Sequence, residues 1–128
     1  MRKITILVAG PPALSRIIKY LFASHPDFEV IGTIGGLKGL APQAERLHPK
    51  LIVAAVKPVS TGVDSAVLAI KRSSPLSKLI FICSVSDFIS GALKSGADAC
   101  LEPEMLLMRL LPTASALSAR SQHRSSRS

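Results

Sequence analysis

This sequence contains no tryptophan, few other aromatic residues and only two cysteines. One tyrosine and four phenylalanines among 128 residues leave the core to be built from aliphatic side chains and alanine, since nearly half of the chain is apolar. The two cysteines, Cys83 and Cys100, lie in strand-like segments far apart in the sequence. This usage is typical of small hydrophobic residues in a reducing compartment, and it predicts neither a disulfide nor a metal site.

No apolar run approaches the length of a membrane span. The first ten residues, MRKITILVAG, are charged and then apolar, in the order of a signal peptide. The apolar part, Ile4–Ala9, is too short for the core of such a signal and has the length of a strand. We therefore predict one cytoplasmic domain without a membrane segment, of a size that can bury a core.

Acidic residues are half as common as basic ones, 8 against 16, and the formal charge is +8. Such an excess raises nucleic acid or an acidic protein as candidate partners. Three of the basic residues, Arg120, Arg124 and Arg127, fall in the Ser/Arg-rich end, which starts near Ser118 and is predicted to be disordered. That end has no aromatic residues for stacking on bases, so specific recognition of DNA or RNA is not supported. We place the domain at residues 1–117 and the tail at 118–128.

The most apolar stretch, residues 51–56 in KLIVAAVKPV, has no alternation and is too short for a helix. A continuous apolar run between turn signals is typical of a parallel strand that is covered on both faces. Pro49 precedes the run and Lys57-Pro58 follows it. We interpret it as the central strand of a sheet.

Similar reasoning applied to the rest of the chain predicts five strands that alternate with five helices. The predicted strands are residues 3–9, Phe28–Ile34, 51–56, 79–83 and Ala99–Leu101. The predicted helices run from Ala13 to about His25, from beyond Gly36 to Leu47, over 63–72, over 88–94, and from near Pro103 to about Leu111. Pro42 suggests a late start or a kink in the second helix, and Pro112 is predicted to kink or end the last one. This alternation predicts a doubly wound parallel sheet between two layers of helices.

At this point the chain resembles the response-regulator receiver domain, the CheY-like module of two-component signalling. The matching segments, from about Met1 to Leu111, are ITILVA, ALSRIIKYLFASHPDFEVIGT, HPKLIVAAVKP, TGVDSAVLAIKRSSP and GALKSGADACLEP. The resemblance implies a flavodoxin-like, three-layered α/β/α fold with strand order 2-1-3-4-5. It also implies a site at the carboxyl ends of the strands, where family members hold Mg²⁺ on acidic residues and phosphorylate an aspartate. A hydroxyl and a lysine then contact the phosphoryl group.

Carried over residue by residue, the acidic groups of that site are missing. The metal-binding pair falls on Ala9 and Gly10, or on Gly10 and Pro11, and the phosphoacceptor position falls on Ala55. None of these residues has a carboxylate, so the resemblance implies a degenerate pseudo-receiver that binds no metal or cofactor and is not an enzyme.

In family members a lysine and a hydroxyl contact the phosphoryl group, and only the hydroxyl has a match in this chain. The lysine position falls at Glu102 or Pro103, or is deleted, so no amine is expected there, whereas Ser84 matches the switch hydroxyl. Ser84 can equally be an ordinary serine at the end of a strand. Asp87 is a candidate substitute phosphoacceptor, although an aspartate before a helix is more typical of an N-cap. Lys57 is either a charge over the vacated site or a solvated loop lysine.

The resemblance therefore predicts a regulatory or protein-interaction module that works without phosphorylation. Family members use the face of the fourth helix, fifth strand and last helix for partners and dimers. In this chain the apolar candidates on that face are Phe88, Ile89, Met105 and Met108. A signalling protein or a second copy is the expected partner; the alternatives are an active receiver that uses Asp87 and a basic nucleic-acid-associated protein.

Overall fold

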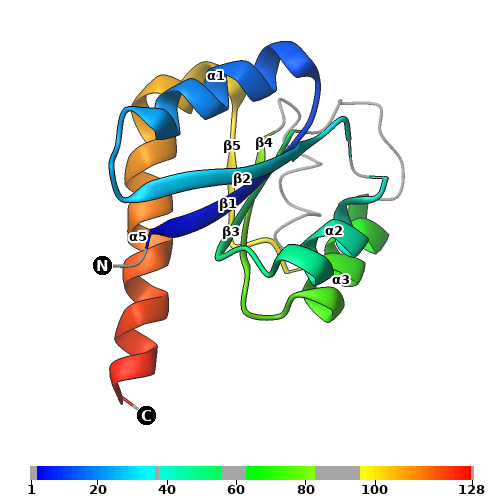
Figure 1. Ribbon diagram of the computed structural model, residues 1–128, viewed down its shortest axis with the longest axis vertical. Coiled ribbons are helices and arrows are strands. Elements are labelled where there is room, and N and C mark those ends of the chain that lie inside the picture. Colours follow the sequence, from blue (N-terminus) through cyan, green and yellow to red (C-terminus); the bar gives the residue numbers. More distant parts are fainter. Residues whose placement is uncertain (1–2, 37, 56–62, 83–95, 128) are drawn as a thin grey trace.

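The computed structural model describes residues 3–36, 38–55, 63–82 and 96–127. Its five parallel strands form one sheet in the order β2-β1-β3-β4-β5, with helices on both faces (Figure 1). This is the predicted flavodoxin-like arrangement, so the fold class read from the sequence is confirmed.

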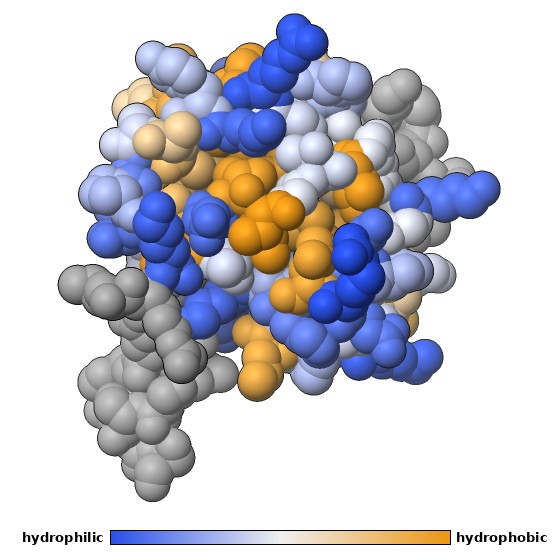
Figure 2. Space-filling view, viewed as in Figure 1, coloured by the Kyte–Doolittle hydropathy of each residue, from blue (hydrophilic) through white to orange (hydrophobic). Residues whose placement is uncertain are grey.

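The strands begin and end close to where the apolar runs predict them. Their bounds are β1 Ile4–Ala9, β2 Phe28–Ile34, β3 Leu51–Ala55, β4 Lys78–Ile82 and β5 Ala99–Leu101. All five residues of β3 are buried, as expected for a central strand between two helical layers. By contrast, β2 lies at the edge of the sheet (Figure 1). On the side of the molecule seen in Figures 1 and 2, apolar side chains gather near the middle.

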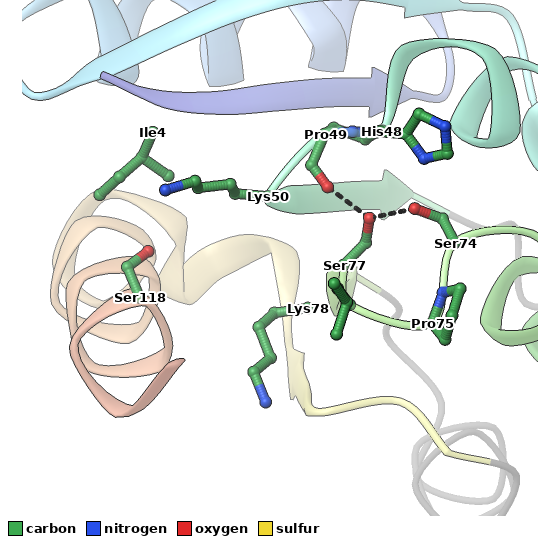
Figure 3. Close-up of a pocket in the computed structure, with 10 residues that line it drawn as sticks. Ile4, His48, Pro49, Lys50, Ser74, Pro75, Ser77, Lys78 and Ser118 are labelled. Carbon is green, nitrogen blue, oxygen red and sulfur yellow. Dashed lines mark hydrogen bonds between the residues drawn. The ribbon is translucent and has the colours of Figure 1, made fainter. Parts of the chain in front are cut away.

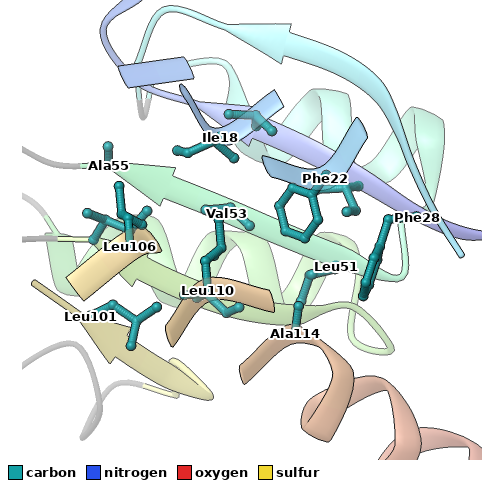
Figure 4. Packing of buried hydrophobic residues seen from close by; sticks show 14 of the residues in the cluster. Ile18, Phe22, Phe28, Leu51, Val53, Ala55, Leu101, Leu106, Leu110 and Ala114 are labelled. Carbon is teal, nitrogen blue, oxygen red and sulfur yellow. The ribbon is translucent and has the colours of Figure 1, made fainter. Parts of the chain in front are cut away.

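The helices divide between the two faces of the sheet. Their bounds are α1 Pro12–Ala23, α2 Leu40–Leu47, α3 Val63–Ser73, the 3-10 turn η1 Pro103–Met105 and α5 Leu106–Arg127. One buried cluster joins the sheet to α1 and α5 through Ile18, Phe22 and Leu110, among others (Figure 4). A second cluster joins the other face to α2 and α3 through Ala44 and Val67. The predicted fourth helix, residues 88–94, lies outside the described residues.

Two prolines lie within helices. Pro42 is the third residue of α2, within the first turn, where backbone amides have no intrahelical partner, so the helix starts late, at Leu40, as the proline suggested. Pro112 does not end α5, which continues to Arg127. Pro112 is exposed, so water can hydrate the Met108 carbonyl whose helical partner the proline removes.

The continuation of α5 includes the Ser/Arg-rich segment from Ser118, for which the sequence predicted disorder. The backbone there is helical, while the division between a domain at residues 1–117 and a separate tail stays a prediction. Within the residues described, no helix combines the length and the hydropathy that a membrane crossing requires.

Candidate functional site

The carboxyl ends of β1 and β3 meet at one edge of the sheet, which we call the carboxyl edge. Ala9 pairs with Ala54 in the parallel register between these strands, and Ala55 pairs with Ile82 of β4. Ala9 and Ala54 have no exposed surface, and Ala55 is 8% exposed. In open parallel sheets this is the edge at which ligands bind. Here it presents methyl groups that are already packed.

Gly10 closes the space beside Ala55. Its φ of +148° is rare for residues with a side chain, and a Cβ built at Gly10 would lie 2.9 Å from the Cβ of Ala55. Atoms at that separation overlap, so the backbone of residue 10 lies directly against Ala55. A side chain at residue 10 therefore has no room unless the end of a strand moves.

The polar groups of Gly10 are also occupied. Its amide donates to the carbonyl of Ile34 at 2.9 Å, and its carbonyl accepts a 3.3 Å hydrogen bond from the buried Ser15 hydroxyl. The amide of Ser15 donates to the carbonyl of Pro11 at 2.9 Å, which ties the turn after β1 to the first turn of α1. The turn after β1 is therefore held by its own hydrogen bonds.

Ala55 belongs to the larger apolar core rather than to a polar cleft. It shares the buried cluster with Ile18 of α1 and Leu106 of α5 (Figure 4). Burying a charge among such groups without a partner is costly, because the interior cannot replace the lost hydration. The surroundings of Ala55 suit the alanine that is there.

Glu102 and Pro103 follow β5, and both are exposed. Pro103 begins η1, and the Glu102 carbonyl accepts the amide of Met105 at 2.9 Å. Neither residue brings an amine to this part of the edge. The structure describes no group of three or more histidine, cysteine or acidic side chains that could hold a metal ion, within the ranges 3–36, 38–55, 63–82 and 96–127.

The remaining predicted site residues lie outside the part of the chain that the structure describes. They are Cys83, Ser84, Asp87, Phe88, Ile89 and Lys57. Their proposed roles stay predictions. Of the predicted interaction face, Met105 is half-buried and Met108 is 71% exposed on α5.

The polar contacts that sequence reasoning missed lie at the opposite, amino edge of the sheet. Asp98 accepts the Lys71 ammonium at 2.7 Å and the Leu79 amide at 2.8 Å through one carboxylate oxygen. Lys71 also donates to the Ser77 carbonyl at 3.0 Å. These contacts join the end of α3, the start of β4 and the turn before β5. No local pattern could predict them, because 27 residues separate Lys71 from Asp98.

A pocket of roughly 690 Å³ lies at the same amino edge, between β3, β4 and α5 (Figure 3). The Ser77 hydroxyl donates to the Pro49 carbonyl, so the Ser74 hydroxyl is the donor in its contact with Ser77. Both hydroxyl protons are thus used inside the protein. Lys50 and Lys78 also line the pocket. Their positive charges attract anions, but they do not position a catalytic base or a nucleophile.

Several solved structures with this fold are receiver domains or response regulators. The response regulator domain of Thermotoga maritima CheB is 22% identical, with a TM-score of 0.76, covering 91% of this chain and 98% of that chain. The signal receiver domain of a modulated diguanylate cyclase from Desulfovibrio desulfuricans is 14% identical, with a TM-score of 0.78, covering 94% and 97%. A DNA-binding response regulator of the LuxR family from Staphylococcus aureus is 14% identical, with a TM-score of 0.76, covering 89% and 98%.

No family model matches this sequence, and no curated protein matches it. At these low identities the structural likeness establishes the fold and leaves function to be argued from the site. The chain has the fold of response-regulator receiver domains, over nearly all of its length.

Proposed function

We propose that this chain is a pseudo-receiver: a cytoplasmic, non-enzymatic module of a two-component pathway that acts through protein contacts and without phosphorylation. In a receiver, phosphorylation shifts an equilibrium between two conformations. A chain that cannot be phosphorylated has that equilibrium set by its sequence or biased by a bound partner. The conformation of such a chain would therefore depend on whether a partner is bound, whereas the conformation of a receiver depends on whether it is phosphorylated.

One observation carries this proposal: Gly10 lies against Ala55 at the carboxyl edge of the sheet, and neither residue has a carboxylate. Phosphoryl transfer to a carboxylate needs a nucleophile and a divalent cation to offset the crowded negative charge. The carboxyl edge supplies neither at Ala9, Gly10, Pro11 or Ala55, and a Cβ at residue 10 would already lie only 2.9 Å from the Ala55 Cβ. The proposal takes Ala55 as the counterpart of the phosphoacceptor.

The interaction face that we propose is formed by the fourth helix, β5 and α5. Met108 is its most exposed described residue, at 71%, and Met105 lies half-buried one turn earlier. Methionine adapts its flexible side chain to differently shaped partners, which suits it to a binding surface. Phe88 and Ile89 extend this face in the proposal.

Phosphoryl transfer is tested by incubating the chain with radiolabelled acetyl phosphate and Mg²⁺. We expect no labelling, because Ala9, Gly10, Pro11 and Ala55 offer no carboxylate to attack phosphorus. Labelling that requires Mg²⁺ and disappears in Asp87→Asn would contradict the proposal and favour an active receiver with a substitute carboxylate.

The interaction face is tested by comparing Met108→Glu with Leu76→Glu in capture experiments from the native host. Both residues are exposed, at 71% and 89%, but Leu76 lies in the turn before β4 at the amino edge. We expect Met108→Glu to abolish capture of a signalling protein and Leu76→Glu to retain it. Equal capture by both variants would remove this face from the proposal.

A further inference from the structure

A second exposed apolar surface lies between α1 and the start of α5, and we call it the α1–α5 hollow. It has a volume of roughly 840 Å³ and is lined mainly by Leu14, Ile17, Tyr20, Leu21 and Leu107. Leu106, which is 3% exposed, also contributes to it and belongs to the core beneath. The hollow is therefore an apolar depression whose lining continues into the core.

Three large side chains in this hollow are unusually exposed for their type. Ile17 is 46% exposed, and Tyr20 and Leu107 are each 77% exposed. Single exposed apolar residues are ordinary on protein surfaces, but a shared depression of them marks a binding surface. Tyrosine is also a frequent anchor of protein interfaces, because it buries a large ring and keeps a polar end.

The two rims of the hollow carry opposite charges. On the α1 rim lies Arg16, and Lys19 follows on the same helix, which contains no acidic residue. On the η1 rim lies Glu104, and Glu102 immediately precedes that turn. Ion pairs within the described ranges involve only Lys71 with Asp98 and His25 with Asp27, so the rim charges have no such partner there.

We propose that the α1–α5 hollow is a homodimer interface that pairs two copies of this chain about a two-fold axis. With the axis parallel to the hollow and between its rims, Arg16 faces Glu104 of the partner subunit, and Glu104 faces Arg16 of the partner subunit. A surface with one basic and one acidic rim is complementary to itself in this arrangement. A partner with another sequence would need the same charge pattern in reverse.

This dimer leaves the proposed interaction face of the pseudo-receiver open. Leu107 lines the hollow with α1, whereas its neighbour Met108 lines a different depression with Asp98 and Ala99. The two residues thus lie on different sides of α5. Dimerisation and partner binding use separate surfaces, so each can fail without the other.

The dimer is tested on the full chain by sedimentation equilibrium over a range of concentrations. We expect a monomer–dimer equilibrium whose dissociation constant rises at least about tenfold in Leu107→Glu, because a charge is then buried twice in the interface. Leu76→Glu is the matched control, since it adds the same charge at an exposed leucine elsewhere. It should leave the dissociation constant unchanged.

A charge exchange tests which residues face each other. We expect Arg16→Glu and Glu104→Arg each to weaken the dimer, because like charges then meet at both ends of the interface. The double variant Arg16→Glu/Glu104→Arg should restore the dissociation constant to within about threefold of the original. Circular dichroism of each variant reports whether the fold is retained.

Three results would overturn the inference. The chain could be monomeric at every concentration, Leu107→Glu and Leu76→Glu could have equal effects, or the double exchange could fail to restore a dimer that both single changes weaken. A dimer that is lost in Met108→Glu but retained in Leu107→Glu would place the contact on the other side of α5. None of these results bears on whether the carboxyl edge accepts a phosphoryl group.

Discussion

Gly10 and Ala55 meet at the end of two adjacent strands, and each limits what the other can be. The left-handed φ of Gly10 suits a residue without a Cβ, and a Cβ there would lie only 2.9 Å from the Ala55 Cβ. Ala55 in turn is 8% exposed within the core that α1 and α5 cover. These two small residues thus fill the carboxyl edge between β1 and β3.

We expect Gly10→Ala to lower the free energy of unfolding by about 2–4 kcal/mol, because it adds a strained backbone conformation and an overlap with Ala55. Gly35→Ala is the control, since a Cβ there would meet no atom within 4 Å and its φ is not positive. That change should alter stability by less than about 1 kcal/mol. Urea denaturation measures the free energy of unfolding of both variants. Equal losses would show that the overlap with Ala55 does not destabilise Gly10→Ala.

Ala55→Asp should not restore phosphorylation, although it places a carboxylate at the position of the phosphoacceptor. The new side chain would lack a metal ion and would be forced against Gly10, so we also expect a loss of about 2–4 kcal/mol of stability. Acetyl phosphate labelling in Mg²⁺ and thermal unfolding are the measurements. Labelling of Ala55→Asp would mean that a metal site survives at this edge.

At the scale of secondary-structure elements, one aspartate joins three of them. Asp98 lies before β5, contacts Lys71 of α3 and accepts the amide of the buried Leu79 in β4. The backbone amide of Asp98 returns a hydrogen bond to the Leu79 carbonyl at 2.8 Å. These contacts position the last strand, which has only three residues to pair.

We expect Asp98→Ala to destabilise the protein by about 2–3 kcal/mol, because it leaves the buried Leu79 amide without this acceptor and the Lys71 ammonium without its carboxylate. Asp98→Asn should cost about 1 kcal/mol less than this, since its side-chain oxygen can still accept the Leu79 amide. Chemical denaturation distinguishes the two. A loss of equal size in both variants would assign the whole effect to the ion pair with Lys71.

Pro112 lies inside α5 and supplies a prediction about that helix. We expect Pro112→Ala to stabilise the protein by about 1–2 kcal/mol, because it restores the hydrogen bond to Met108, while the unfolded chain regains some freedom. Thermal unfolding followed by circular dichroism should show a higher midpoint. A lower midpoint would mean that the proline ring makes a necessary contact.

Strands were predictable from the sequence because their signals are local. Phe28–Ile34 lies between Pro26-Asp27 and Gly35-Gly36, and the structure has the strand within those bounds. The order of the strands followed from the alternation of elements and the resemblance. Pro112 misled the prediction, because a local rule ignores the packing of Leu110 and Ala114, which holds the helix on both sides of it.

The candidate site was predictable in one respect and hidden in another. Residue types alone showed that Ala9, Gly10 and Ala55 bring no carboxylate. The direct contact of Gly10 with Ala55 depends on the register of β1 with β3, which no local pattern contains. The α1–α5 hollow was missed for a similar reason, since Ile17 and Leu107 meet only after folding.

At the scale of the whole molecule, the sheet has packed alanines at its carboxyl edge, and an exposed apolar hollow lies beside it, between α1 and α5. The proposed partner face includes Met108, and the proposed dimer face includes Tyr20 and Leu107. Such a molecule would act as a scaffold whose assembly is not controlled by phosphorylation. Its thermal midpoint should then be the same with and without Mg²⁺, because a ligand that does not bind the native state cannot stabilise it.

The most direct test of the central claim is an amide NMR titration of the full chain with Mg²⁺ and beryllofluoride, which mimics an aspartyl phosphate. The account predicts that the resonances of Ala9, Gly10, Ala55 and Ser84 do not shift. A saturable shift at these residues that requires both components would show that a carboxylate and a metal occupy this edge, and would contradict the assignment as a pseudo-receiver.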